Sequence, residues 1–381
     1  MKLLQVNASY KPAYIYGGPT MSVSKLSEEM AKAGYAVEVF TTTANGADEV
    51  VVTPNIPIDV DGIKVTYFKR ITGDHTHFSP ALLRKLWTEV RGYDVVHIHA
   101  WWNLVSVLSC WIALRRGVPV IVSPRGTLSA YSFTNKNDLP KKIIHKLLGK
   151  SLLRRSSIHV TSDREKEAME ILVKPKHIFN IPNFIALPDK ALNTPAIVDD
   201  HLKLIFLSRI EEKKGLEILF DALANVTIPY HLTIAGDGNA VYIDELKLLS
   251  EKNGISERIS WVGFQTENKF SLLQQHHLMV LPSYDENFGN VVIESLSVGT
   301  AVLISNNVGL AAYVEQNNFG WVCENDPASF VTVISQLNTE NARLKSTREK
   351  APGKIRADFD EKKLVGQYMD MYNQTVSNGR I

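Results

Sequence analysis

Two glutamates eight residues apart give the clearest chemical signal in this sequence. Glu286 lies in a predicted loop after an apolar strand, and Glu294 lies in the helix predicted to follow. If all eight residues were helical, the two carboxylates would be ~12 Å apart along the axis. The free N–H groups at a helix start attract anions. The spacing alone would fit two solvated surface glutamates, but Phe288-Gly289 in the loop and the apolar stretch from Val291 to Ile293 favour a nucleotide diphosphate sugar laid along the helix start.

Two cations five residues apart form a second candidate group. Arg209 and Lys214 lie between an apolar strand and the helix predicted to begin at Gly215. Arginine can bind a diphosphate through two parallel hydrogen bonds, and lysine binds it as a point charge. The pair is therefore suited to hold a diphosphate. An exposed loop in which Glu211 and Glu212 face the lysines is the alternative interpretation.

The elements that must position these groups alternate between strand and helix. The alternation runs through about the first 180 residues and restarts at about residue 200. This pattern is typical of α/β folds with parallel sheets. We predict two doubly wound Rossmann-like domains facing a cleft, residues 1–185 and 200–358. A helix within residues 360–381 is expected to pack back on the first domain.

The composition narrows the class of protein. The net charge of +2 over 381 residues does not indicate a nucleic-acid partner. The two cysteines, Cys110 and Cys323, do not form a disulfide framework, which favours a reduced, cytoplasmic setting. No run approaches the ~20 apolar residues that a membrane-spanning helix needs.

Taken together, these motifs resemble those of the retaining family-4 (group 1) glycosyltransferases of the GT-B fold. The resemblance rests on Arg209 with Lys214-Gly215, and on the segment from Glu286 to Glu294. It extends over nearly the whole chain through Gly17-Gly18 and through the strand that ends at His99. Ser208 and the stretch from Val308 to Leu310 depart from the family, which usually has glycines there.

The resemblance implies the reaction and its substrates. A hexose or N-acetylhexosamine would move, with retention, from a nucleotide diphosphate sugar to a saccharide or lipid-linked saccharide. The process would be cell-surface polysaccharide or lipopolysaccharide biosynthesis. UDP is preferred over GDP only because UDP is common in the family. No metal and no other cofactor is expected.

The resemblance also assigns roles to individual residues. Catalytic roles fall on Glu286, His99, Arg209 and Lys214. The donor would contact Arg209 and Lys214 together with Gly17, Gly18, Asn287, Phe288, Gly289, Asn290 and Glu294. The acceptor would contact His97 and Arg125. Packed core histidines, a plain turn at Gly18 and a structural ion pair at Arg125 are the alternatives.

Two further patterns bear on metals and membranes. The triplets at residues 59–61 and 358–360 have the form Asp-x-Asp, which other glycosyltransferases use to hold a divalent ion. The first belongs to a predicted hairpin turn at Asp61-Gly62 and the second lies far along the C-terminal region, so we expect no metal site. Basic and apolar residues alternate at helical spacing over residues 140–155. This pattern fits either docking at the inner face of the plasma membrane or an ordinary helix with a basic outer face.

Two other functions fit the same fold. A nucleotide-sugar epimerase would change the donor sugar with no acceptor present. A non-catalytic nucleotide-sugar-binding subunit would bind the donor without transfer, although the complete set of Arg209, Lys214, Glu286 and Glu294 argues for activity.

Overall fold

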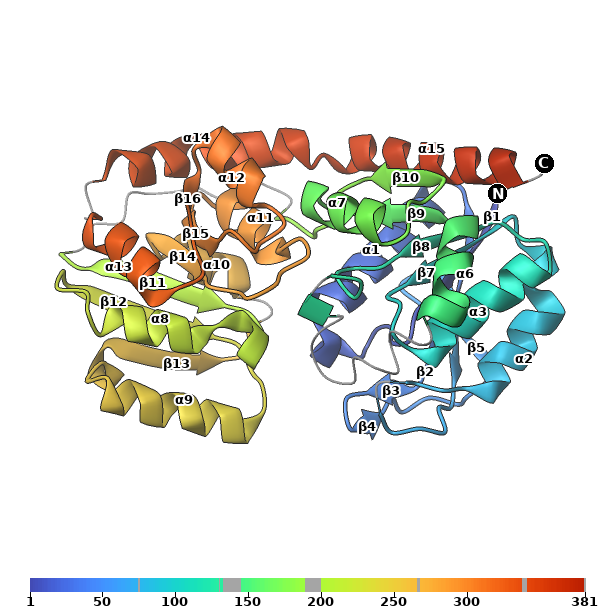
Figure 1. The fold of residues 1–381 in the computed structure, drawn as a ribbon, viewed down its shortest axis with the longest axis horizontal. Coiled ribbons are helices and arrows are strands. Elements are labelled where there is room, and N and C mark those ends of the chain that lie inside the picture. The colour runs from blue at the N-terminus through green and yellow to red at the C-terminus, as the bar shows by residue number, and fades with distance from the viewer. Residues whose placement is uncertain are drawn as a thin grey trace. The chain divides into compact units, whose positions relative to one another are not determined.

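The computed structural model (Figure 1) describes residues 1–74, 76–129, 131–132, 145–188, 200–265, 268–337 and 341–379. The chain divides into two compact units. Unit 1 comprises Met1–Ile185 and Glu361–Ile381, and unit 2 comprises Ala186–Asp360. Each unit is built on one large sheet flanked by helices, which confirms the predicted α/β class with parallel strands.

Unit 1 contains an eight-stranded sheet of order β10-β9-β8-β7-β1-β2-β6-β5. All of its pairings are parallel except β5 with β6. The strands are β1 (Lys2–Val6), β2 (Ala36–Thr42), β5 (Pro57–Val60), β6 (Ile63–Phe68), β7 (Val95–His99), β8 (Val120–Ser123), β9 (Ser157–Val160) and β10 (His177–Asn180). A small hairpin, β3 (Ala44–Asn45) with β4 (Asp48–Glu49), lies apart from this sheet. The chain adds strands to one side of β1 and then returns to its other side. The switch point, where such sheets bind ligands, is therefore between β1 and β7.

The turn between β5 and β6 confirms the predicted hairpin. Asp61 and Gly62 both have positive φ, 53° and 79°. Aspartate followed by glycine favours this conformation in a two-residue hairpin turn.

Helices cover both faces of the sheet of unit 1. They are α1 (Gly18–Lys32), α2 (Pro80–Glu89), α3 (Leu104–Arg115), α6 (Lys150–Arg155), α7 (Asp163–Leu172) and α15 (Glu361–Gly379). A π-helical turn, η3 (His145–Gly149), precedes α6, and the short 3-10 turns are η1 (Tyr14–Tyr16) and η2 (Val90–Gly92). Successive residues of β1 point to opposite faces: Leu3 joins the core formed with α1 and α15, whereas Leu4 joins the core formed with α2 and α3. The last helix, α15, buries Leu364, Tyr368 and Tyr372 in the first of these cores.

Helix α1 begins at Gly18, the second residue of the glycine pair. Gly17 takes the N-cap position with a φ of 63°, and Pro19 lies in the first turn. Proline is well tolerated there because the N–H it lacks would have no intrahelical partner. The helix start therefore lies at the predicted glycine pair.

Unit 2 contains a six-stranded, wholly parallel sheet of order β13-β12-β11-β14-β15-β16. The strands are β11 (Leu202–Leu207), β12 (Tyr230–Ala235), β13 (Ile259–Gly263), β14 (Leu278–Leu281), β15 (Ala301–Ser305) and β16 (Gly320–Cys323). The helices are α8 (Leu216–Leu223), α9 (Ala240–Lys252), α10 (Lys269–Gln274), α11 (Asn290–Ser297), α12 (Ala311–Asn317), α13 (Pro327–Ser335) and α14 (Ala342–Asp358), with 3-10 turns η4 (Glu212–Lys214) and η5 (Ser256–Arg258). Strands are added from β11 through β12 to β13 before the chain crosses to β14. The switch point of this sheet is therefore between β11 and β14.

Candidate active site

The two loops predicted to hold the donor leave the sheet of unit 2 at its switch point. Residues 208–215 follow β11, and residues 282–289 follow β14, the adjacent strand. The backbone N–H of Tyr284 donates to the carbonyl oxygen of Lys213 at 2.9 Å. The Lys213 ammonium also lies 2.9 Å from the Asp285 carboxylate. The loops are therefore fastened together at the carboxyl edge of the sheet, where ligands bind in this class of fold.

Lys214 and Glu286 are brought into direct contact by these loops. The Lys214 ammonium donates a hydrogen bond to the Glu286 carboxylate. Glycine at 215 permits this arrangement, because its φ is +68° and a Cβ there would be 2.2 Å from the carbonyl oxygen of Pro282. Gly215 thus lets the loop that carries Lys214 lie close to the backbone of the second loop.

The charge state of Glu286 is set by its cationic neighbours. Burial alone would raise the pKa of this carboxyl, but Lys214, Lys213 and Arg209 together outweigh burial and hold the pKa below its ordinary value. The group is therefore a carboxylate at neutral pH and can only accept hydrogen bonds. Arg209 is more exposed than Lys214 and pairs with Glu211 at 2.5 Å.

The backbone around Glu286 is held by a neighbouring loop and by one glycine. The Glu286 N–H donates to the carbonyl oxygen of Asn307 at 3.1 Å, and its own carbonyl oxygen accepts from Gly309 at 2.8 Å. Gly289, with φ +86°, is the N-cap of α11, and a Cβ there would be 3.0 Å from Cγ1 of Val308. No acidic residue occupies the first turn of α11, so its N–H groups present only positive partial charge.

The remaining predicted donor residues are distributed unevenly over this loop and helix. Phe288 is 3% exposed and packs edge-to-face on Phe359, so it belongs to the core of unit 2. Asn287 lies in the loop, and Asn290 is the first residue of α11. Their contacts with a donor stay predictions.

The segment from Glu286 to Glu294 is only partly helical, so it differs from the eight helical residues considered for the sequence. Helix α11 begins only at Asn290, so half of the eight-residue separation is loop. The assumption of a ~12 Å helical rise is therefore wrong for this segment. Glu294 is nearly buried and pairs with Lys269 of α10 at 2.8 Å, a partner that the sequence pattern did not indicate.

In unit 1, the predicted acceptor and catalytic histidines lie inside the protein. His97 and His99 of β7 are both fully buried, with their rings 4.2 Å apart. His97 contacts Tyr372 at 2.8 Å through Nδ1 and Ser123 at 2.7 Å through Nε2. His99 contacts Gln5 at 2.6 Å through Nε2. Both rings are thus packed core histidines in this structure, and a direct contact with substrate stays a prediction.

These contacts continue into one chain of hydrogen bonds across unit 1, which we call the histidine chain. It runs through Arg125, His99, Gln5, Tyr372, His97, Ser123, His159 and the carbonyl oxygen of Ile181. The two ends fix its direction, because the Arg125 guanidinium can only donate and a carbonyl oxygen can only accept. Every member then donates to the next, and all three histidines are neutral.

The electrostatic surroundings keep these histidines neutral. Burial, followed by the charge of nearby groups including Arg125, holds the pKa values of His97 and His99 well below the ordinary value. Burial and Arg125 lower the pKa of His159 to about 3. Four members of the chain, Gln5, Ser123, His159 and Tyr372, were not among the predicted site residues. Polar residues on otherwise apolar strands were the only signal for three of them.

Arg125 and the glycine pair also lie on the carboxyl side of this sheet. Arg125 follows β8 and donates from Nε to His99 Nδ1 at 3.2 Å. It also donates from Nη1 to Ser22 and to Asn183, both at 2.9 Å. Gly17 caps α1 and Gly18 is its first residue, so their predicted approach to the donor would occur at a helix start.

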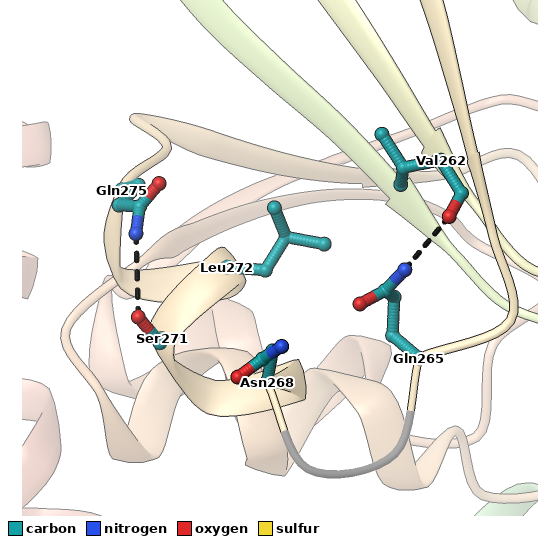
Figure 2. Close-up of a pocket in the computed structure, with 6 residues that line it drawn as sticks. All are labelled: Val262, Gln265, Asn268, Ser271, Leu272 and Gln275. Carbon is teal, nitrogen blue, oxygen red and sulfur yellow. Dashed lines mark hydrogen bonds between the residues drawn. The ribbon is translucent and has the colours of Figure 1, made fainter.

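A shallow cavity of about 420 Å³ opens on the surface of unit 2 (Figure 2). It is lined by Val262, Gln265, Asn268, Ser271, Leu272 and Gln275. The Gln265 amide donates to the carbonyl oxygen of Val262 at 2.7 Å, and the Gln275 amide donates to the Ser271 hydroxyl at 3.2 Å. Among the described residues, none of the lining side chains is charged, and three of them lie on or directly after α10.

The predictions on metals and membranes meet the following observations. Over the described ranges, no group of three or more His, Cys, Asp or Glu side chains could hold a metal ion. None of the helices that the structure describes is long and apolar enough to span a membrane. Residues 140–144 of the basic stretch lie outside the described residues. Farther along it, Leu152 and Leu153 pack into the core of unit 1.

Comparison with known proteins gives matches over most of the chain. The family described as "Glycosyltransferase Family 4" matches residues 16–187, and the family described as "Glycosyl transferases group 1" matches residues 189–354. The D-inositol 3-phosphate glycosyltransferase of Mycolicibacterium smegmatis is 26% identical over 390 residues, covering 96% of this chain and 88% of that protein. That of Jonesia denitrificans is 26% identical over 349 residues, covering 80% and 78%.

Solved structures of the same architecture are similar in fold. HepE of Anabaena, in complex with UDP and glucose, matches with a TM-score of 0.77 and 19% identity, covering 98% of this chain and 100% of that one. Sucrose-phosphate synthase of Thermosynechococcus elongatus matches with a TM-score of 0.76 and 19% identity, covering 99% and 100%. The sequence matches and the fold point to the same family.

Proposed function

Because this chain belongs to the group 1 glycosyltransferases of the GT-B fold, we propose that it transfers a hexose or N-acetylhexosamine, with retention, from a nucleotide diphosphate sugar to a saccharide acceptor. The observation that carries the proposal is the contact between Lys214 and Glu286 at the switch point of unit 2. One carboxylate, one buried ammonium and the start of α11 converge there. This combination suits a ligand with hydroxyl groups at one end and phosphate at the other.

The proposed chemistry assigns a role to each of these groups. As the bond from the anomeric carbon to the β-phosphate oxygen breaks, its electron pair passes to the diphosphate. Lys214, Arg209 and the N–H groups of α11 stabilise that negative charge. The acceptor hydroxyl attacks from the face that the diphosphate leaves, and its proton passes to the departing phosphate. Glu286 accepts hydrogen bonds from the sugar hydroxyls and orients the ring.

The proposed donor is a UDP-sugar, and the proposed reaction needs no metal. The relative from Anabaena was solved with UDP and glucose, which supports UDP over GDP. The cations at Arg209 and Lys214 provide the positive charge that a divalent ion would otherwise supply.

A saccharide or lipid-linked saccharide of a cell-surface polymer is the proposed acceptor. Membrane contact through residues 140–155 has less support, because Leu152 and Leu153 face the core and leave the basic side chains of Arg154 and Arg155 at the surface.

A ligand panel tests the donor and the metal requirement together. Thermal unfolding is followed with UDP, GDP, ADP and their sugars, first without added metal and then with a chelator. We expect stabilisation by UDP and UDP-sugars that survives chelation. Stabilisation that the chelator abolishes would overturn metal independence, and no stabilisation by any nucleotide would overturn the donor site.

A transfer assay then tests the chemistry. NMR of the product from a defined donor should show the anomeric configuration of the donor, and Glu286→Ala should reduce transfer about 100-fold or more. An inverted product would refute retention. A changed donor sugar in the absence of any acceptor would identify an epimerase, and unimpaired transfer by Glu286→Ala would remove Glu286 from the catalytic groups.

A further inference from the structure

Arg125 is a partly buried cation that has no anionic partner in the part of the chain that the structure describes. Its contacts are to three neutral acceptors: the His99 ring nitrogen, the Ser22 hydroxyl and the Asn183 side-chain oxygen. No ion pair within 4.0 Å links its guanidinium to any described carboxylate. A structural ion pair, the alternative interpretation of this residue, is therefore contradicted.

The acidic residue whose charge reaches Arg125 is engaged elsewhere. The Glu165 carboxylate accepts from the backbone N–H of Gly126 at 2.8 Å and from that of Thr161 at 3.0 Å. These bonds tie the loop after β8 to the start of α7, so Glu165 acts on the guanidinium through its charge without forming an ion pair with it. Burial lowers the pKa of Arg125, and the charge of Glu165 offsets this only in part.

The histidine chain keeps this environment free of negative charge. His99 presents the unprotonated Nδ1 to Arg125 because its Nε2–H is committed to Gln5. The position of the guanidinium is thus fixed by groups that orient it without neutralising it. Burying an unpaired charge is unfavourable, so a bound anion would gain the interaction that the protein itself does not supply.

A second source of positive potential adjoins the guanidinium. Ser22, which accepts from Nη1, lies on the 15-residue helix α1 close to its start. No acidic residue and no capping side chain occupies the first turn of that helix. In addition, no described residue hydrogen-bonds to Nη2 of Arg125, which leaves this nitrogen available as a donor pair.

We propose that Arg125, oriented by His99, Ser22 and Asn183, binds an oxyanion carried by the sugar acceptor, either a phosphate or a carboxylate group. This inference rests on the proposed function and specifies its acceptor as anionic. The site lies wholly within unit 1, on the carboxyl side of β7 and β8. A neutral saccharide would leave the guanidinium without a counter-charge and would bind more weakly.

Asn183→Asp is the sharpest test, because it places a carboxylate where the structure has a neutral oxygen 2.9 Å from Nη1. The variant supplies the counter-ion internally while keeping the shape of the side chain. Glucose 6-phosphate, glucuronate and glucose are titrated calorimetrically into the protein, with and without saturating UDP. We expect both anions to bind more tightly than glucose, and Asn183→Asp to weaken their binding about tenfold or more. Thermal stability should be unchanged or higher.

Two comparison variants separate this outcome from general damage. Asn239→Asp makes the same charge change at the N-cap of α9, where aspartate caps as well as asparagine, and should bind the anions normally. Arg125→Gln should lose the preference for anions over glucose. Binding is also measured with vesicles that contain phosphatidic acid. If the wild type binds only to these vesicles and Asn183→Asp does not, the oxyanion is the phosphate of a lipid.

Two results would overturn the inference. One is equal anion binding by the wild type, Asn183→Asp and Arg125→Gln, and the other is no binding of any anionic probe by the wild type. If UDP binds normally in either case, the proposed function stands and only the anionic acceptor falls. If UDP fails to bind while anion binding depends on Arg125, the proposed function fails and the anion site remains.

Discussion

The two sheets of this protein prepare their switch points in opposite electrostatic ways. In unit 2, the loops beside β11 and β14 are joined by ion pairs, Lys214 with Glu286 and Lys213 with Asp285. In unit 1, β1 and β7 are joined by the histidine chain, and the members of this chain other than Arg125 are neutral. The first arrangement presents paired charges, which the proposed donor would replace with its own. The second holds one cation, Arg125, that forms no ion pair with any described carboxylate.

The difference follows from burial. The carboxylate and ammonium groups at the switch point of unit 2 keep contact with solvent or with each other, so they can stay ionised. The rings of His97, His99 and His159 are fully buried, where a charge without a partner is strongly disfavoured. Lowering the pH should therefore destabilise unit 1 more than unit 2. Removing a lysine at the switch point should instead impair the proposed transfer reaction in unit 2.

The largest expected effect is acid destabilisation of unit 1. The pKa values of His97, His99 and His159 are lowered in the folded protein, so below about pH 6.5 the unfolded chain binds more protons than the folded one. Stability is thus complete above this pH and falls as the pH decreases. The three histidines together approach a loss of about 4 kcal/mol per pH unit.

Hydrogen exchange between pH 7 and pH 5 measures this effect for each unit separately. After correction for the intrinsic rate, peptides from β7 and β8 should lose protection more steeply than peptides from β14 and β15. Unit 2 is not insensitive, because burial lowers the pKa of His276 to about 4. Equal slopes in the two units, or a steeper slope in unit 2, would refute the neutral histidine chain.

Loss of the buried lysine at the other switch point is the next largest effect. Lys214→Met should reduce transfer 100- to 1,000-fold, about 3–4 kcal/mol, because the leaving diphosphate loses its main charge partner. The pKa of Glu286 should rise in this variant, because burial is then opposed by fewer cations. Steady-state kinetics with a fixed donor measures the loss.

Lys247→Met is the matched control for that variant. Lys247 lies on α9 of the same unit and makes only a 3.4 Å contact with Asp244 among the ion pairs that the structure describes. Its removal should leave transfer unchanged. Similar losses in both variants would contradict the role of Lys214.

Two separate glycines test how closely the backbone before α11 packs against its neighbours. Gly289 and Gly254 both have positive φ, 86° and 66°. Alanine at either position should cost about 1–2 kcal/mol of folding free energy through backbone strain. Only at Gly289 would the new methyl group also press on Val308 and approach Glu286, whereas Gly254 faces open space.

Calorimetric titration with UDP separates the two consequences. Gly289→Ala should weaken UDP binding about tenfold, and Gly254→Ala should leave it unchanged while lowering the melting temperature to a similar degree. If both variants bind UDP like the wild type, the position of the α11 start does not matter for the donor.

The two loops proposed to bind the donor could be located from the sequence because their charged residues lie close to strand ends. Arg209, Lys214 and Glu286 lie within a few residues of strand ends that the apolar pattern reveals. The histidine chain could not be predicted, because tertiary packing joins residues as distant in sequence as His97 and Tyr372. Pro352 shows the same limit, since proline followed by glycine predicts a break and α14 nevertheless continues through it.

The partner of Glu294 was missed for a similar reason. Lys269 lies 25 residues earlier, and only the packing of α10 beside α11 brings the two charges together. The ~12 Å interval applies only to eight helical residues, whereas α11 begins at Asn290, directly after Gly289 with its positive φ. Local patterns thus identified the charged groups, and packing decided how they are paired.

The smallest expected effect concerns that pair, and it tests whether the two units differ in kind. Lys269→Met should reduce stability by less than about 1 kcal/mol at low ionic strength, and the loss should vanish at 1 M salt, because partly exposed ion pairs are weak and screened. Tyr372→Phe in unit 1 should cost about 1–3 kcal/mol at either salt concentration, because it leaves a buried nitrogen of His97 without its donor. Melting temperatures of both variants at 0.05 M and 1 M salt measure the contrast. A salt-dependent loss in Tyr372→Phe would mean that the histidine chain carries charge, and the distinction between a charged and a neutral switch point would fail.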